Sequence, residues 1–418
     1  METQRETDME VVFERCAGLD VHEQTVVACV RKPGERARQR RGEVRTFSTV
    51  MRGLEELKGW LRSEGVSHVA MESTGVYWRP VYSVLEGSFE LLLVNARHIK
   101  GVPGRKTDVR DCEWITQLLE CGLLRASFVP PQEVRDLRDL TRLRKSLVRE
   151  RSDHVNRIAK TLELANIKLA SVASDIMGKS GRAILEALIA GNEDPEQLAG
   201  LAQGLLKKKT DQLREALCGR MNPHYAFLLK QHLKLIDTYN AQIAELDARL
   251  EECMRPFAEP YQRLQSIPGV GARAAQTIIA EIGVDMSRFP TAANLASWAR
   301  LCPGVHESAG KRQPARTGKG AMWLRATLQE AAVSAARTKG TYYQAFYFRV
   351  KARQGKKTAI VAVQHSMLVT IWHMLSEGIP HKDLGADYFQ RRDKLRICRH
   401  HVHRLRQLGY AVTISEAA

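Results

Sequence analysis

The sequence predicts a multidomain protein in which an α/β domain precedes two mostly α-helical regions. Short apolar strands alternate with helices up to about residue 128, a pattern that favours a mixed sheet. After Pro130-Pro131 the apolar spacing becomes almost entirely helical, and such a proline pair marks a boundary. We therefore expect an α/β domain at residues 1–130, a helical region at 131–258, a helical domain at 259–385 and a basic tail at 386–418.

The first domain is expected to begin with two strands and a tight turn within residues 12–31, where apolar and polar residues alternate. The pattern then allows a third strand. Further elements follow at helical or strand spacing: a helix at 50–64, a strand at 67–72, a helix at 74–85 and a strand at 89–94. A basic loop containing Arg105 and Lys106 leads into a helix that should begin at Thr107.

Four carboxylates stand at the ends of these elements: Asp20, Glu72, Asp108 and Asp111. Asp108 and Asp111 lie three residues apart, so they share one helix face. Acids in a first helical turn also complement the helix dipole, and that structural explanation stays open. If the four gather at one sheet edge, oxygen-only ligation selects Mg²⁺ or Mn²⁺. Two such ions about 4 Å apart clamp a phosphodiester.

The central region combines a long arginine-rich helix at 134–169 with a heptad pattern at residues 229–253. The heptad favours a coiled-coil seam, although a helical hairpin packed within one chain fits the same spacing. The arginines are consistent with a solvated helix face or with a surface that follows a phosphate backbone. We expect this region to provide spacing and oligomerisation, not chemistry.

The third region carries two further motifs. Residues 264–282 (LQSIPGVGARAAQTIIAEI) predict a helix-hairpin-helix, in which Gly269 and Gly271 let the backbone approach a phosphate; a plain glycine turn is the alternative. A long polar loop is expected at 301–320, and it places Ser308 among lysines and arginines. A serine hydroxyl there could attack phosphorus, although most loop serines are solvated turn residues. Helices are expected at 321–337, 342–354 and 358–377.

Charge and composition narrow the partners. A net charge of +17 favours a polyanion, nucleic acid first and an acidic membrane surface second. The N-terminus shows no apolar signal segment, and no apolar run approaches the roughly 18 residues of a spanning helix, so we expect a cytoplasmic protein without a membrane partner. The eight cysteines form no CxxC pair. Cys398 and the histidines near it are too crowded for usual metal spacing, and we interpret 391–407 as a nucleic-acid-contacting or disordered tail.

Several motifs together resemble the DEDD transposases of bacterial insertion sequences, specifically the bridge-RNA-guided recombinases of insertion-sequence family one-ten, related to the pilin-gene invertase. In the first domain these are GLDVH, MESTGVYW and GRKTDVRDCEW, which contain the four acids. Later come IPGVG, LCPGVHESAGK and GKGAMWLRATLQEAA in the same order as in the family. The likeness covers roughly residues 13–128 and 260–378.

The resemblance implies a RuvC-type, RNase-H-like first domain that binds Mg²⁺ through the four acids, with Ser308 as the nucleophile joined transiently to DNA. It also implies a homodimer or homotetramer that combines the acids of one subunit with the serine of another. A bridge RNA would pair with donor and target DNA. Nucleic-acid contacts are expected from basic and glycine-bearing stretches: Arg105, Lys106, Gly269, Gly271, Lys311, Arg312, Arg316, Lys319 and Arg325.

Two positions depart from the family pattern: Ala309 stands between Ser308 and Gly310, and Cys112 replaces a common alanine. The added Cβ of Ala309 narrows backbone freedom beside the serine. We expect a transposase or site-specific recombinase. The alternatives are a RuvC-like, metal-dependent junction nuclease that does not use Ser308, and a nucleic-acid-binding protein without catalysis.

Overall fold

The computed structural model describes residues 10–35, 39–73, 75–95, 111–302, 306–308, 311–313, 318, 320–392 and 394–413. The chain divides into two compact units, Met1–Val129 and Pro130–Ala418. The division falls at the proline pair that ends the strand-rich part of the sequence. The further boundaries expected at residues 258 and 385 stay predictions.

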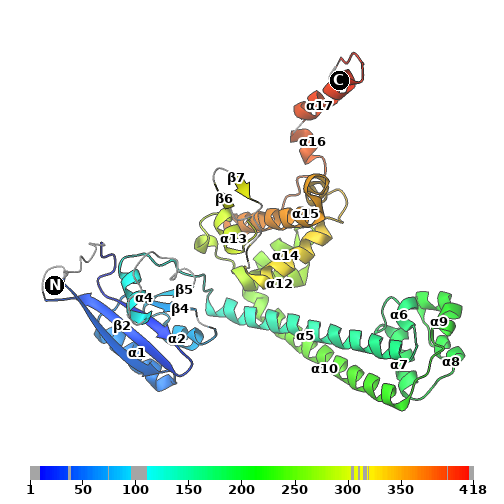
Figure 1. Ribbon diagram of the computed structural model, residues 1–418, viewed down its shortest axis with the longest axis horizontal. Helices are drawn as coiled ribbons and strands as arrows, with labels where there is room; N and C mark the ends of the chain where they lie inside the picture. The colour runs from blue at the N-terminus through cyan, green and yellow to red at the C-terminus, as the bar shows by residue number, and fades with distance from the viewer. Residues whose placement is uncertain are drawn as a thin grey trace. The chain divides into compact units, whose positions relative to one another are not determined.

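A five-stranded sheet with the order β3-β2-β1-β4-β5 forms the centre of the first unit (Figure 1). The strands are β1 (Cys16–Val21), β2 (Thr25–Pro33), β3 (Arg40–Ser48), β4 (His68–Glu72) and β5 (Glu90–Val94). β1, β2 and β3 pair antiparallel as consecutive hairpins, whereas β4 and β5 run parallel to β1. The predicted α/β domain is therefore confirmed.

Helices cover both faces of this sheet. One face carries Leu19, Met71 and their neighbours in a core with α1 (Met51–Ser63) and α2 (Trp78–Leu85). The other face packs Cys16, Ala70 and Val94 against α4 (Asp111–Glu120). Because side chains alternate along a strand, burial on both faces makes β1 and β4 almost continuously apolar.

The sequence placed the start of α2 too early. The helix begins at Trp78, not at residue 74, and Gly75 has a φ of +53°. That left-handed backbone conformation suits glycine and cannot continue a right-handed helix. The stretch after β4 is therefore a turn that leads into a shorter helix.

The second unit begins with a helical hairpin formed by α5 (Gln132–Leu164) and α10 (Pro223–Met254) (Figure 1). Their contacts run in opposite directions, Arg144 to Asp247 and His154 to His232, so the helices are antiparallel. The heptad positions Leu229, Ile236, Ile243 and Leu250 are all buried. The helical hairpin packed within one chain, one of the two structures that the heptad spacing allowed, is thus present.

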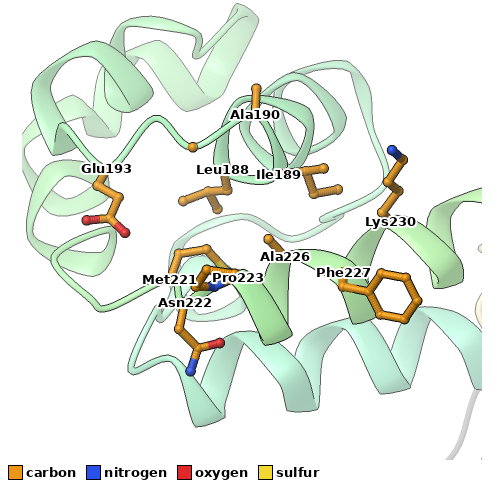
Figure 2. A pocket seen from close by; sticks show the side chains of 11 residues that line it. Leu188, Ile189, Ala190, Glu193, Met221, Asn222, Pro223, Ala226, Phe227 and Lys230 are labelled. Carbon is orange, nitrogen blue, oxygen red and sulfur yellow. The ribbon is translucent and has the colours of Figure 1, made fainter.

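Short helices join the far ends of α5 and α10 and share a core with them. They are α6 (Leu169–Val172), α7 (Lys179–Ile189), α8 (Pro195–Gly200), a 3-10 turn (Gly204–Lys209) and α9 (Thr210–Ala216). A pocket of about 480 Å³ opens between the end of α7 and the start of α10 (Figure 2). Leu188, Met221 and Phe227 line it, and among its described lining residues only Glu193 is acidic. The pocket therefore lacks a constellation for phosphoryl transfer.

The remaining elements are again helical, apart from one small hairpin. They are a 3-10 turn (Arg255–Phe257), α11 (Ala258–Gln265), α12 (Ala272–Ile282), a 3-10 turn (Met286–Arg288), α13 (Ala292–Trp298), β6 (His306–Ser308), β7 (Lys311–Gln313), α14 (Met322–Ala335), α15 (Tyr342–Glu377), α16 (Tyr388–Arg392) and α17 (Lys394–Gln407). α14 packs on both α12 and α15, and α13 also packs on α15. The mostly helical remainder is therefore confirmed.

Helix α15 is interrupted at Gly355, whose φ of 81° and ψ of 172° are not helical. The two helices expected at 342–354 and 358–377 are its two halves. By length and hydropathy alone, α15 could cross a membrane, although the sequence analysis expected no apolar run of that length. Val363, Met367 and Ile371 are buried at helical spacing, and α13 and α14 pack on the helix, so we interpret it as a core helix.

Two segments expected to be irregular contain regular structure. Residues 306–308 and 311–313 of the expected loop form an antiparallel hairpin in which Ser308 pairs with Lys311. The spacing of two residues between these partners is typical of a tight hairpin, and alternation over three residues is too short to signal a strand. The tail forms the helix α17, where the sequence allowed disorder.

Candidate active site

The acidic residues of the first two parallel strands lie at matching positions. β1 and β4 pair in register from Cys16 with His68 to Leu19 with Met71. The next residues along the two strands are Asp20 and Glu72. Residues at matching positions of neighbouring strands point to the same face of a sheet. The register therefore brings two of the four predicted acids together at the C-terminal ends of β1 and β4.

Helix α4 covers that same face because Gly18 has no side chain. A Cβ on Gly18 would lie 2.5 Å from Thr116 Oγ1 and 2.6 Å from the carbonyl oxygen of Cys112. The Thr116 hydroxyl, which also faces Gly18, donates a 2.6 Å hydrogen bond to the Cys112 carbonyl. Since residues two apart share a strand face, Asp20 follows Gly18 on the side that α4 occupies.

The first turn of α4 supplies the third acid. Asp111 is the first residue of the described helix and is exposed, and the next residue, Cys112, contacts Gly18. Burial raises the pKa of the Cys112 thiol to about 12, and the charge of Asp20 adds to that shift. The packing of Cys112 on Gly18 places the helix start near the end of β1. Three of the four acids therefore belong to one edge of the sheet.

His22 is a neighbour of this edge that the sequence analysis did not select. Its Nε2 lies 3.2 Å from Oδ2 of Asp20, whose side chain is 22% exposed. The signal was present in the sequence, because a histidine two residues after a strand-end acid can return to the same face. The imidazole can orient the Asp20 carboxylate by pairing with one of its oxygens.

The opposite end of α4 is fixed by a buried ion cluster. Glu120 is only 3% exposed, and its Oε1 accepts a 2.6 Å hydrogen bond from Nε of Arg40. Its Oε2 lies 3.0 Å from Nε of Arg31. Removing one partner of such a cluster leaves an uncompensated buried charge, which costs several kcal/mol, about 3–5 in measured cases. The cluster ties α4 to β2 and β3 and so holds Asp111 at the sheet edge.

The fourth acid, Asp108, lies outside the described residues, as do Arg105, Lys106 and the expected helix start at Thr107. Within the described ranges, no group of three or more His, Cys, Asp or Glu side chains forms a metal site. Asp20, Glu72 and Asp111 therefore do not by themselves form a metal site, and the position of Asp108 is known from sequence alone.

Ser308 is the last residue of β6. In the strand register it lies opposite Lys311 of β7, and Glu307 lies opposite Arg312. Arg316 and Lys319 fall outside the described residues. Gly318 and Gly320, which follow the hairpin in sequence, lie against Arg300 after α13 and Arg325 of α14. A Cβ on Gly320 would lie 2.6 Å from Cβ of Arg300, and Arg325 donates to the carbonyl of Gly318 at 2.5 Å. Arg325 therefore holds Gly318, and its predicted contact with nucleic acid stays a prediction.

The two glycines of the predicted helix-hairpin-helix have different surroundings. Gly269 has a φ of +86°, and a Cβ there would lie 2.3 Å from the carbonyl oxygen of Ala331 in α14. Close helix packing therefore explains Gly269. Gly271 caps α12 and has open space around it. Gly271 keeps open space that a phosphate could approach, and the contacts of both glycines with nucleic acid stay predictions.

Several arginines of α5 serve a purpose that the sequence did not suggest. Arg142 makes two hydrogen bonds, of 2.8 and 2.9 Å, to the buried carboxylate of Glu281 in α12. Arg138 donates to the carbonyls of Ala280 and Glu281, which are at the end of that helix. Arg144 binds Asp247 of α10 at 2.5 Å. These side chains join helices inside the unit and are not a solvated face.

Comparison with known families decides the identity of the chain. Residues 17–167 match a family model described as a transposase, of the DEDD type of IS110. Residues 261–347 match a second model, described as the transposase of the IS116/IS110/IS902 family. Together the two regions cover more than half of the chain. The chain belongs to the IS110 family of transposases.

This transposase is similar to two curated proteins. The transposase for insertion sequence element IS1111A of Coxiella burnetii is 26% identical over 289 residues, which cover 68% of this chain and 71% of the relative. An uncharacterized 43.6 kDa protein of insertion element IS110 from Streptomyces coelicolor is 34% identical over 123 residues, 28% of each chain. The first family match contains all four predicted acids, and the second contains Ser308.

Proposed function

We propose that this transposase cuts and rejoins DNA with Ser308 as the nucleophile and with a divalent cation, Mg²⁺ or Mn²⁺, held by acids of the first unit. The observation that carries the proposal is the register of β1 and β4, which aligns Asp20 with Glu72 below the start of α4. Carboxylates gathered in this way repel one another, and bound cations offset that repulsion. Asp108 and Asp111 complete the proposed ligand set.

The same proposal assigns the first unit to the RuvC or RNase-H-like folds. Three antiparallel strands followed by two parallel strands, with helices on both faces, support the assignment. The acids fit a hard cation because all of their donor atoms are oxygen. When bound, such ions polarise a phosphodiester and stabilise the developing charge on the attacking and leaving oxygens. His22 would keep the Asp20 carboxylate oriented toward the sheet edge.

Ser308 accounts for rejoining as well as cutting. Its Oγ forms a bond to phosphorus while the bond from phosphorus to a deoxyribose oxygen breaks. The serine loses its proton, and the leaving oxygen gains one. The phosphoserine ester conserves the energy of the phosphodiester, so a second DNA hydroxyl can attack it and restore the serine without an added energy source. Lys311 and Arg312 belong to the neighbouring strand, where cations would offset charge on the reacting phosphate.

A guide RNA is part of the same proposal. The net charge of +17 supports binding to more nucleic acid than one duplex, and the resemblance to bridge-RNA-guided recombinases supplies the role of the RNA. Sequence choice would then come from base pairing with donor and target DNA, while the protein holds backbones, by analogy with another guided system. We place this activity in the bacterial cytoplasm, in homodimers or homotetramers. Sequencing the RNA that co-purifies with the protein tests the guide.

The test of the chemistry is a pair of alanine variants. Ser308→Ala should abolish strand exchange and the covalent protein–DNA species seen on a denaturing gel. Ser297→Ala, an exposed serine of α13, is the matched control and should keep both. Strand exchange at the wild-type rate in Ser308→Ala would refute the serine role.

Two other outcomes identify the alternatives. Cleavage by Ser308→Ala that leaves a free 5′-phosphate and 3′-hydroxyl would favour a junction nuclease. Unchanged nucleic-acid binding in Asp20→Ala, with no cleavage by either the variant or the wild type, would favour a binding protein without catalysis. Under our proposal, Asp20→Ala loses cleavage, adduct formation and the response to added Mg²⁺.

A further inference from the structure

A strongly basic stretch of α15 is not used by the proposed chemistry. Between Glu330 and Glu377 the sequence contains no Asp or Glu, whereas seven lysines and arginines occur there: Arg337, Lys339, Arg349, Lys351, Arg353, Lys356 and Lys357. Residues 351–358, which contain four of them, are all exposed. Like charges held this close repel one another and destabilise the folded state, so the cluster calls for a bound polyanion.

Three of these cations do not belong to ion pairs in the described part of the chain. Within the described part of the chain, no carboxylate pairs with Arg353, Lys356 or Lys357. The arginines of α5 show the contrast, since Arg142 and Arg144 are occupied by Glu281 and Asp247. Lys356 and Lys357 also follow the break at Gly355, where a helical segment starts again. Cations at a helix start oppose the helix dipole, so helix stability does not explain them.

An exposed aromatic ring lies beside the charges. Phe348 is 52% exposed, although the neighbouring Tyr343 and Tyr347 are buried. Nζ of Lys351 lies 5.6 Å from the centre of the Phe348 ring. One exposed phenylalanine is ordinary on a protein surface. A ring beside Lys351, followed along the chain by three further exposed cations, is, however, a combination by which proteins bind single strands, with bases stacked on the ring and phosphates on the cations.

We propose that residues 348–357 form a binding surface for a single-stranded polynucleotide, which we call the α15 surface. Phe348 stacks on an unpaired base, and Lys351, Arg353, Lys356 and Lys357 bind the adjoining phosphates. The inference rests on the proposed function for its strands, because cutting and guiding both expose unpaired nucleotides. Unpaired DNA and unpaired RNA share this chemistry, and the ring favours either of them over a closed duplex.

Fluorescence anisotropy with the full-length protein tests the α15 surface. The probes are a labelled deoxythymidine oligonucleotide of about 20 nucleotides, the matching uridine strand and a DNA duplex of equal length. Lys356→Ala/Lys357→Ala should weaken binding of single strands about tenfold at low salt. It should also reduce the slope of log affinity against log salt by about 1.4, at about 0.7 for each lost phosphate contact. Lys207→Ala/Lys208→Ala removes the same charge from exposed positions elsewhere and should change affinity less than twofold.

The contribution of the Phe348 ring is tested by a second variant and its matched control. Phe348→Ala should weaken binding of single strands about tenfold and leave duplex binding unchanged. Phe227→Ala, which removes an equally exposed ring on α10, should change neither. Tighter binding of the DNA strand identifies the substrate as the natural occupant, and tighter binding of the RNA strand identifies the guide. Both results support the surface.

Other results would overturn the inference. Equal losses from the two lysine pairs would show that net charge acts without a site. A change in sedimentation but not in strand binding for Lys356→Ala/Lys357→Ala would show a protein interface instead. Adduct formation by Ser308 is measured separately, so a failed serine mechanism and a failed α15 surface give different patterns.

Discussion

At the residue scale, Gly18 determines whether α4 can reach the acid edge. A Cβ at this position would lie within 2.6 Å of the backbone nitrogen of Thr116 and the carbonyl of Cys112, and backbone cannot rotate away. We expect Gly18→Ala to lower the free energy of unfolding by about 1–3 kcal/mol, the usual range for an overpacked core. Cleavage should fall as well, because α4 carries Asp111. Urea unfolding and a cleavage assay measure the two effects.

Gly42→Ala is the control for that substitution. Gly42 lies in β3 of the same sheet, and nothing approaches within 4 Å of the Cβ that it would gain. Alanine should therefore be neutral or slightly stabilising there. A Gly18→Ala protein as stable as Gly42→Ala would contradict the tight packing of α4 on β1.

Cys112 predicts a pH dependence. Its pKa is raised from 9.0 to about 12, first by burial, so the folded chain keeps the thiol protonated where the unfolded chain loses the proton. Stability from this residue is complete below pH 9 and is lost as pH rises from 9 towards 12. We expect Cys112→Ala to keep the fold and to show a shallower loss of stability over that window. If the free energy of unfolding falls equally with pH in both proteins between about pH 8 and 11, the thiol does not contribute to the pH dependence.

At the element scale, the contact between α5 and α12 depends on Glu281. This carboxylate is 1% exposed and is held by Arg142 and Arg138. Glu281→Ala would leave those guanidinium groups without their partner, so we expect a loss of about 3–5 kcal/mol in the free energy of unfolding. Glu330→Ala removes an ion pair between Lys145 and a carboxylate that is 73% exposed, and should cost at most about 1 kcal/mol. Similar losses for both variants in urea unfolding would refute a central role of Glu281.

The sequence predicted the elements that depend on contacts between residues close in sequence, and it missed the contacts between residues far apart in sequence. The heptad of α10 was readable because Leu229, Ile236, Ile243 and Leu250 repeat locally on one helix face. The role of the arginines in α5 could not be predicted, because their partners Asp247 and Glu281 lie about a hundred or more residues away in sequence. The same holds for Gly269, whose neighbour Ala331 is on a distant helix.

At the scale of the whole molecule, the acids were predictable but their arrangement was not. Asp20 and Glu72 could be selected from their places at strand ends, yet only the pairing of β1 with β4 shows that they are adjacent. Sequence periodicity contains no information on which strands pair. His22 is a different case, because its spacing of two residues from Asp20 was visible in the sequence. Asp108 lies outside the described residues and remains a sequence prediction.

The acids and the serine belong to different units of the chain, residues 1–129 and 130–418. The proposed reaction needs both at one phosphate, so the two units must meet there, either within one chain or between two. The family resemblance favours two chains. A mixture of Asp20→Ala and Ser308→Ala proteins should then recover adduct formation, because one chain provides the intact acids and the other the intact serine. Each variant alone should form no adduct. If subunits exchange in the mixture and no adduct appears, the acids and the serine of a single chain act together.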